Sequence, residues 1–329
     1  MSIVYSRSFE DQKGKIKVEL VSSGVPPEQA EITADCFATA DLYGVTSHGA
    51  AVLPAHLQRI KQGGYNLTPA FNTIHETPSF AVIDGDNAMG PVSADYCMKY
   101  AVNKCRDSGM FTVFSRNNNT FGPAFYYPLK AAEDGFLGLI FSNSPAQMAP
   151  CGGKEKMLGT NPFSAVIPVP GKEPIIIDMA TSITAKSKIL EYQKQGKQLP
   201  DGWATDENGL PTNDPDEALR GLVLPMAGFK GTGLAMLFDI VAGALSGAAY
   251  LNNVGRFYGD GCGCMNVGYC VAAIDPRIVF GQSYGDVINN YVSSLRNCQT
   301  VEGEKIVLPG DDRSQTKNRN LSSECESPH

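Results

Sequence analysis

The sequence lacks long apolar runs and an excess of positive charge, and each absence excludes a class of function. No stretch approaches the ~18 consecutive apolar residues of a membrane-spanning helix, and residues 1–15 contain no apolar signal-peptide core. The 27 lysines and arginines are outnumbered by 34 aspartates and glutamates, which leaves a net charge of −7 that repels phosphate backbones. We therefore expect a cytoplasmic protein that binds neither a membrane nor nucleic acid.

Metal-binding patterns are also scarce. The nine cysteines are an odd number scattered along a long chain, which indicates reduced thiols rather than a disulfide framework. The close set Cys262, Cys264 and Cys270 has no second pair beside it, and none of the four histidines is near. We therefore expect no metal site.

The common nucleotide-binding signatures are missing as well. Neither a G-x-G-x-x-G fingerprint nor a P-loop occurs, and the glycine groups at 228–233 and 259–263 have the wrong spacing. If the protein binds a dinucleotide, it does so outside the Rossmann scheme.

The features that are present indicate a large globular protein. A chain of 329 residues with 43% hydrophobic residues predicts about two domains. Residues 8–62 have a helical pattern. From about residue 71, short apolar strands such as 80–84, 111–115 and 137–142 alternate with helices, and this alternation predicts an α/β architecture around a buried sheet.

The second half of the chain has less regular patterns. We expect a helix over 181–195, a polar loop over 200–222, and one long apolar helix over Gly231–Leu251. Small residues in the long helix suit close packing, either in the core or at a dimer interface. From Ser314 onward the composition is polar, which predicts a loose tail.

Ser47-His48-Gly49 is the first candidate for chemistry. The tripeptide lies on a loop before a predicted helix, so Ser47 could hold one ring nitrogen of His48 while the other faces a substrate. Histidine titrates near neutral pH and can give or take a proton. The alternative is a serine that caps a helix beside an ordinary histidine, and local sequence alone favours it.

Two further candidates lie at the starts of predicted helices. Asp178 ends an apolar strand, where α/β proteins bind ligands, and it could orient His48, bind a ribose or cap a helix. Lys230 stands among three glycines before the long helix, an arrangement that suits a phosphate or carboxylate better than a simple turn.

A dense set of hydrogen-bonding groups follows the strand at 111–115. Arg116 precedes three consecutive asparagines, Asn117–Asn119. Asparagine is common in turns, but three in a row after an arginine exceed what a turn requires.

The order of these motifs resembles the type 2 malate/L-lactate dehydrogenase family. This family includes ureidoglycolate and sulfolactate dehydrogenases, 2,3-diketo-L-gulonate reductase and Δ1-piperideine-2-carboxylate reductase. The resemblance covers about residues 10–313. It rests on these segments: 41–49, 62–64, 115–122, 152–153, 159–162, 178–182 and 224–233.

The resemblance implies an α/β fold with a non-Rossmann, mixed-sheet domain that binds NAD or NADP. We expect this domain over 75–286, and a helical domain built from 1–74, which carries Ser-His-Gly, and 287–329. A homodimer and a small-molecule substrate are also implied. His48 would transfer the proton, with Ser47 and Asp178 as its partners.

The family pattern also implies the other site residues. Those for the cofactor are Ser115, Arg116, Asn117, Asn118, Asn119, Thr120, Asp178, Met179, Ala180, Lys230, Gly231, Asp311, Asp312 and Arg313. Those for the substrate are Val52, Thr120, Ser144 and Asn161.

Two positions depart from the family pattern. Many members carry arginine where this chain has Val52, and that arginine would hold a substrate carboxylate. Many also carry histidine where this chain has Thr120. The carboxylate could instead be held by Arg59, Arg116 or Lys154, or the substrate could be larger, less charged or a cyclic imine.

The sequence therefore predicts an oxidoreductase that moves a hydride between nicotinamide and a 2-oxo acid, a 2-hydroxy acid or a related compound. One alternative is a cyclic imino-acid reductase of the Δ1-piperideine or Δ1-pyrroline-2-carboxylate type. An alternative of another class is an inactive dimer that binds a small molecule.

Overall fold

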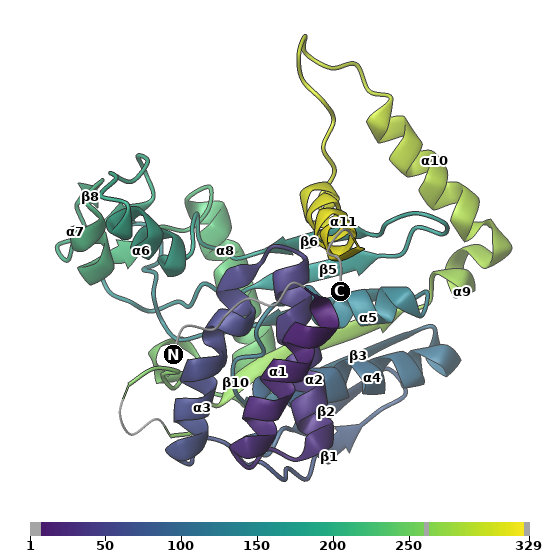
Figure 1. The fold of residues 1–329 in the computed structure, drawn as a ribbon, viewed down its shortest axis with the longest axis horizontal. Coiled ribbons are helices and arrows are strands. Elements are labelled where there is room, and N and C mark those ends of the chain that lie inside the picture. Colours follow the sequence, from purple (N-terminus) through teal and green to yellow (C-terminus); the bar gives the residue numbers. More distant parts are fainter. Residues whose placement is uncertain (1–7, 260–262, 326–329) are drawn as a thin grey trace.

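The computed structural model of the chain describes residues 8–259 and 263–325 (Figure 1). Its helices are α1 (Phe9–Ser22), α2 (Pro27–Leu42), α3 (Leu53–Lys61), α4 (Gly90–Ser108), α5 (Tyr126–Glu133), α6 (Lys186–Lys194), α7 (Pro215–Arg220), α8 (Phe229–Phe238), α9 (Pro276–Phe280), α10 (Tyr284–Arg296) and α11 (Asp311–Cys325). Its strands are β1 (Asn72–Glu76), β2 (Phe80–Asp84), β3 (Met110–Asn118), β4 (Leu137–Ser142), β5 (Phe163–Ile167), β6 (Ile175–Met179), β7 (Ala204–Thr205), β8 (Pro211–Thr212), β9 (Leu222–Val223) and β10 (Val267–Ile274). None of the helices in these ranges is both long and apolar enough to span a membrane.

A mixed seven-stranded sheet forms the centre of the fold. Its strand order is β1-β2-β3-β10-β4-β5-β6. Among the described strands, β2 and β3 pair in parallel across the α4 crossover, and the other pairs of this sheet are antiparallel. A Rossmann fold needs successive parallel crossovers, so this topology confirms the expected α/β, non-Rossmann class.

Helices cover both faces of the sheet, because neighbouring residues of a strand point to opposite sides. On β4, a Cβ at Gly138 would lie 2.7 Å from the Cα of Pro128 in α5, so this face packs closely on α5. The ring of Phe141, which has the opposite orientation, stacks on Phe238 of α8 at 4.8 Å. The largest apolar cluster lies between the sheet, α4 and the helices α1 and α2.

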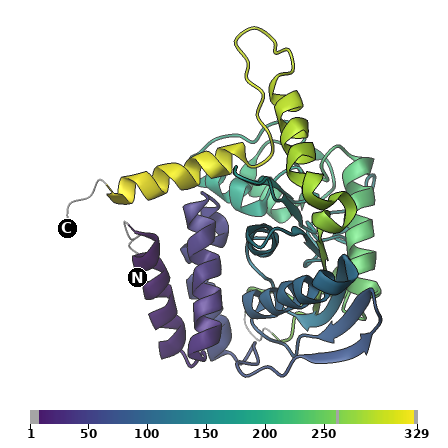
Figure 2. The same cartoon turned by 90° about the vertical axis from the view of Figure 1, so that its right-hand side faces the viewer.

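The C-terminal helix bridges the sheet and the N-terminal helices. Figure 2 shows α11 passing over the ends of the N-terminal helices. Its Asn320 donates to the carbonyl of Leu42 at the end of α2 (2.8 Å), and its Lys317 pairs with Glu173 just before β6 (2.7 Å). The prediction of a loose tail from Ser314 was wrong, because these polar contacts are made with distant segments and leave no apolar periodicity in the sequence.

Two other expectations for the second half were also wrong. The long helix over Gly231–Leu251 is interrupted: α8 passes into a π-helical turn over Asp239–Ala244, where the buried Asp239 carboxylate accepts the N–H of Leu251 (3.0 Å). The polar loop over 200–222 contains α7 and a three-stranded sheet, β8-β7-β9, which pack with α6 around a small core of their own.

The helix expected over 181–195 begins later, at Lys186 in α6. The residues before it form extended backbone contacts instead: the N–H of Ile183 donates to the carbonyl of Leu224 (2.8 Å), and Ser182 forms a bridge with Pro225. These contacts join the end of β6 to the segment that precedes α8.

Candidate functional site

Ser47 and His48 lie in a short 3-10 turn between α2 and α3. The Oγ of Ser47 is 2.9 Å from the Nδ1 of His48, and both side chains are exposed. No hydrogen bond to a described residue engages Nε2 of the imidazole, so this nitrogen is open to a reactant. The arrangement differs from a helix cap, because the Ser47 hydroxyl contacts the imidazole ring and no backbone N–H in the described chain donates to it.

Asp41, at the end of α2, holds this turn in place. Its Oδ2 accepts the N–H of Ala50 (2.8 Å) and the side-chain amide of Gln12. Gly49 packs against the carboxylate so closely that a Cβ there would lie 1.9 Å from Oδ1. Burial raises the pKa of Asp41 to about 6. Sequence reasoning assigned Asp41 no role, although the spacing of Asp41, Gly49 and Ala50 was the available signal.

Asp178 and Arg313 form an ion pair that acts on His48. The Nη1 of Arg313, on α11, is 2.6 Å from the Oδ2 of Asp178, on β6. The pKa of His48 lies below its ordinary value, first because surrounding protein atoms displace water and also because of the Arg313 charge, while the Asp178 charge works against both. The imidazole is therefore neutral at pH 7 and able to accept a proton.

Two of the expected cofactor segments lie side by side. The N–H of Met226 donates to the carbonyl of Thr181 (2.9 Å), which joins the end of β6 to the start of α8. Gly231 permits this approach, since a Cβ there would lie 2.3 Å from the carbonyl oxygen of Met226. Lys230 is exposed.

The start of α8 suits a phosphate. In the described chain, no acceptor bonds the N–H groups of Phe229 and Lys230, the first two of the ten-residue helix. Free N–H groups, the positive end of a helix dipole and a lysine together favour an anion. The residues present therefore fit the pyrophosphate of a dinucleotide.

The segment Ser115–Thr120 uses most of its side chains within the protein. The Nδ2 atoms of the asparagines donate to Asp84 (Asn117, 2.9 Å), Ser115 (Asn118, 3.0 Å) and the carbonyl of Ala88 (Asn119, 2.8 Å). The bonds of Asn117 and Asn119 fasten the end of β3 to the end of β2 and the turn that follows it, whereas the Asn118 bond lies within β3. Thr120 differs, because its hydroxyl has no partner among the described residues, and it is half-buried.

Ser144 and Asn161, expected at the substrate, contact each other. The N–H of Ser144 donates to the Oδ1 of Asn161 (2.9 Å), and the Nδ2 of Asn161 donates to the carbonyl of Ala235 in α8 (2.9 Å). The two residues are thus held next to the helix that begins with the phosphate-compatible N–H groups.

Of the remaining expected residues, Asp311 and Val52 contact other parts of the protein. Asp311 pairs with Arg296 (2.7 Å) and accepts the N–H of Leu308, so its carboxylate fastens the start of α11. Val52 packs partly against the main core, where its neighbour Ala51 faces a pocket.

That pocket has a volume of about 570 Å³ and lies beside the Ser-His turn. Its wall combines the turn, the start of α11 and the start of α6. The lining residues are Tyr43, Gly44, Val45, Thr46, Ser47, Ala51, Ser187, Lys188, Glu191, Asp312, Arg313 and Thr316. His48 is not among them and contacts the lining through the Ser47 hydroxyl.

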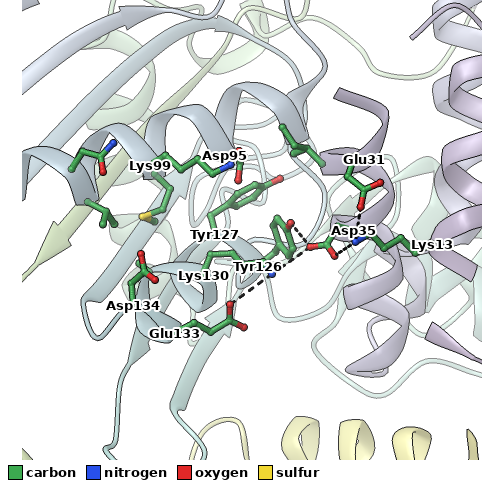
Figure 3. Close-up of a pocket in the computed structure, with 15 residues that line it drawn as sticks. Lys13, Glu31, Asp35, Asp95, Lys99, Tyr126, Tyr127, Lys130, Glu133 and Asp134 are labelled. Carbon is green, nitrogen blue, oxygen red and sulfur yellow. Dashed lines mark hydrogen bonds and ion pairs between the residues drawn. The ribbon is translucent and has the colours of Figure 1, made fainter. Parts of the chain in front are cut away.

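A second pocket, of about 440 Å³, lies between α1, α2, α4 and α5 (Figure 3). Its charged groups are satisfied by one another: Asp35 accepts from Tyr126 (2.6 Å) and pairs with Lys13 (3.0 Å) and Lys130 (3.4 Å). Figure 3 shows these side chains pointing together. The group joins the N-terminal helices to α5 through hydrogen bonds and ion pairs.

The three cations suggested for a substrate carboxylate are placed elsewhere. Arg59 is only 1% exposed and donates to Asn119 (3.0 Å) and to a backbone carbonyl. Arg116 pairs with Asp84 (3.3 Å). Lys154 is exposed and packs beside Gly209, in the loop between β7 and β8.

The described residues contain no group of three side chains that could hold a metal ion. Cys262, part of the close cysteine set, lies outside the described residues, as do residues 1–7. Cys264 is free and exposed, and Cys270 is free and buried.

Comparison with known proteins defines the family. The family model for malate/L-lactate dehydrogenase matches residues 8–327. A malate dehydrogenase of Pyrococcus horikoshii is 42% identical over 305 residues, which cover 89% of this chain and 83% of that protein.

Solved structures agree with this assignment. Sulfolactate dehydrogenase from Methanocaldococcus jannaschii superposes with a TM-score of 0.89 at 36% identity, over 95% of this chain and 90% of that one. Δ1-Piperideine-2-carboxylate reductase from Pseudomonas syringae has a TM-score of 0.86 at 25% identity, over 97% and 95%.

The chain therefore belongs to the malate/L-lactate dehydrogenase family, as its motifs indicated. It is an NAD- or NADP-dependent oxidoreductase that moves a hydride between nicotinamide and a 2-oxo acid, a 2-hydroxy acid or a related compound.

Proposed function

We propose that the protein interconverts a 2-oxo acid and its 2-hydroxy acid, with His48 as the residue that transfers the proton. The observation that carries the proposal is the exposed imidazole of His48, which is kept neutral by its surroundings and contacts Ser47 at 2.9 Å. A neutral imidazole with one open nitrogen is the form required of a general base.

In the direction of oxidation, Nε2 of His48 accepts the proton of the substrate hydroxyl. Ser47 holds Nδ1 and so fixes the plane of the ring. The negative charge of Asp178 stabilises the imidazolium that results, since an opposite charge nearby favours the charged form. The bound NAD or NADP supplies the hydride acceptor in this direction.

The cofactor would be held chiefly at the junction of β6 and α8. Asp178–Ala180 and Lys230–Gly231 meet there, with free N–H groups suited to the phosphates. Of the segment Ser115–Thr120, the backbone and the Thr120 hydroxyl are the groups left to contribute, because the asparagine side chains are engaged. Asp312 and Arg313 lie across the pocket beside Ser47, and Ser144 and Asn161 would face the substrate.

A cyclic imino-acid reductase is the second candidate. The absence of arginine at Val52 favours it, because this position supplies no cation for a carboxylate, and the neighbouring Ala51 gives the pocket an apolar wall that tolerates a ring. Comparing kcat/KM for pyruvate, oxaloacetate and Δ1-piperideine-2-carboxylate in wild type and in Val52→Arg separates the two. Retention of Ser47, His48, Asp178 and Lys230 argues against the inactive binding protein.

We also propose a homodimer, built on the exposed apolar side chains of α8 and α10. In α10, Val287, Tyr291 and Leu295 recur every four residues and are exposed, which places them along one face of the helix. Leu237 of α8 is 51% exposed. Sedimentation of the active enzyme tests this: a fully active species of about 35 kDa, the mass of one chain, contradicts it. The cytoplasmic location stays a prediction.

The decisive experiment follows NADH and NADPH absorbance with a panel of 2-oxo acids and cyclic imines. We expect reduction of at least one 2-oxo acid. If only cyclic imines react, the second candidate replaces the first, and if neither class reacts while the cofactor binds, the protein is an inactive binder.

A further inference from the structure

We propose that Arg313 binds the carboxylate of the substrate and thus replaces the arginine that this chain lacks at position 52. The inference rests on the 2-hydroxy-acid chemistry proposed above. The family pattern implies that Arg313 binds the cofactor, whereas this inference assigns it to the substrate.

The first support is the position of Arg313. Arg313 and Ser47 both line the pocket of about 570 Å³, and the guanidinium of Arg313 bonds Asp178, the residue whose charge acts on His48. Arg59, Arg116 and Lys154 do not line this pocket. Among the described lining residues, the other cation is Lys188, which already pairs with Glu191 (2.8 Å).

The second support is the unused bonding capacity of Arg313. Nη1 donates to Asp178, and the guanidinium carbon lies 5.0 Å from the ring centroid of Phe125. In the described chain, Nε and Nη2 donate to nothing. A guanidinium with one group anchored and another edge free can bind a carboxylate through two parallel hydrogen bonds.

The third support is rigidity. Arg313 stands in the first turn of α11, and two contacts further along this helix fix it against both halves of the site. Lys317 pairs with Glu173 before β6, and Asn320 bonds the end of α2. These contacts hold α11 in place relative to the Ser-His turn, and the ion pair with Asp178 holds the guanidinium, as orientation of a substrate requires.

Binding of an anion at Arg313 has a consequence for His48. The positive charge of Arg313 contributes to the low pKa of the imidazole. A carboxylate that neutralises this charge raises the pKa of His48 again. His48 therefore becomes a stronger base when the substrate is bound, which is when it must accept the proton of the substrate hydroxyl.

The charges of the pocket also define the class of substrate. Lys188 is paired with Glu191, and the pocket wall carries a further carboxylate, that of Asp312. Arg313 is itself bonded to Asp178, so the edge formed by its unused Nε and Nη2 matches one anionic group, and Asp312 repels a second. The substrate is therefore a monocarboxylate with a neutral remainder, unlike malate or sulfolactate, which carry two anionic groups.

The test uses the full-length protein with bound NADH or NADPH and the variants Arg313→Gln and Arg313→Lys. Arg319→Gln is the matched control, because Arg319 lies on the same helix and, among the residues described, donates only to Thr316 (3.0 Å). Oxamate, an unreactive analogue of a 2-oxo monocarboxylate, is titrated into the complex and followed by quenching of nicotinamide fluorescence. This measurement needs no turnover.

We expect Arg313→Gln to weaken oxamate binding by roughly 10- to 100-fold, the usual effect of losing a charge-assisted hydrogen-bonded pair. Arg313→Lys should lose less, since lysine keeps the charge without the planar fork. The cofactor dissociation constant and the Arg319→Gln control should change by less than about twofold. Among reactive compounds, Arg313→Gln should raise KM for the acid and leave KM for the corresponding 2-oxo amide unchanged.

Three results overturn the proposal. One is weaker cofactor binding with unchanged oxamate affinity, which restores Arg313 to the cofactor. Another is a shifted pH profile of kcat with unchanged KM and oxamate affinity, which makes Arg313 a positioning residue for Asp178. The third is a wild-type preference for oxaloacetate or 3-sulfopyruvate over 2-oxovalerate. If wild type binds oxamate through Arg313 but reduces no 2-oxo acid, the proposed function fails and this inference stands.

Discussion

Replacing Asp41 by asparagine should stabilise the protein at alkaline pH and leave its stability at pH 4 nearly unchanged. Oδ1 of Asp41 is buried and has no hydrogen-bond donor among the described residues, while Oδ2 accepts the N–H of Ala50 and the amide of Gln12. Burial of a partly satisfied charge disfavours the ionised form, and the pKa rises to about 6. Asparagine removes the charge and keeps an acceptor for Ala50.

The sign follows from proton binding in the two states. In the unfolded chain Asp41 ionises near pH ~3.9, whereas in the folded chain it ionises near 6. Between these values the folded state binds more protons, so the contribution of Asp41 to stability falls as pH rises through this window. Two pKa units correspond to about 3 kcal/mol, which is an upper limit because the side chain is only partly buried. We expect a gain of about 1–2 kcal/mol for Asp41→Asn at pH 8.

Equilibrium unfolding in urea at pH 4, 6 and 8 measures this difference. Asp41→Ala is the control for the lost acceptor: the N–H of Ala50 then has no partner, and stability should fall at every pH. An Asp41→Asn variant that is no more stable than wild type at pH 8, or that gains equally at pH 4, would refute the reasoning.

Three further predictions concern the site and the ion-pair group. His48→Ala should lower turnover by roughly 10²–10⁴-fold with unchanged cofactor affinity; near-normal turnover would remove His48 from its role. Lys230→Ala should weaken cofactor binding and spare the chemical step, so a slow single turnover with unchanged cofactor affinity would contradict it. Asp35→Asn should have the opposite sign to Asp41→Asn: burial acts to raise the pKa of Asp35, but the hydrogen bond from Tyr126 and nearby lysines outweigh it and the pKa is lowered. Its stabilising charge is present above pH ~4 and lost below, so this variant should lose roughly 1–3 kcal/mol at pH 7 in urea unfolding and progressively less as pH falls; equal loss at pH 3 would count against the ion pairs.

The sheet and its helices could be predicted from the sequence because their signals are local. The strands over Phe80–Asp84 and Leu137–Ser142 have the same bounds in the structure as in the apolar pattern. Each is short, amphipathic and closed by a glycine or a polar residue. The family motifs added the non-Rossmann class, which no periodicity could have supplied.

The elements that were mispredicted depend on polar contacts between distant segments. α11 has few apolar residues, and its position depends on partners at Leu42, Glu173 and Asp178, more than 130 residues away. The long apolar helix is interrupted at Asp239, whose carboxylate accepts hydrogen bonds from Leu251 and Asn143. A hydropathy pattern contains no signal for these bonds. The candidate site divides in the same way: Ser47 and His48 are adjacent in sequence, whereas the function of Arg313 depends on a strand far upstream.

Because the Ser-His turn and Arg313 lie on separate elements, the site can change its substrate without changing its fold. Val52 and Arg313 stand on different elements, and neither touches the bonds that hold the Ser-His turn to Asp41. A cation can therefore be lost from the turn and supplied from α11 while Ser47, His48 and Asp178 keep their places. The wall of the pocket would then offer Ala51 and Tyr43 to the side chain of the substrate rather than a second unpaired cation. Specificity in this chain would thus be set by the C-terminal helix, and exchange of residues 311–316 with those of a malate-specific relative should transfer preference for a dicarboxylate only if Val52→Arg is made as well.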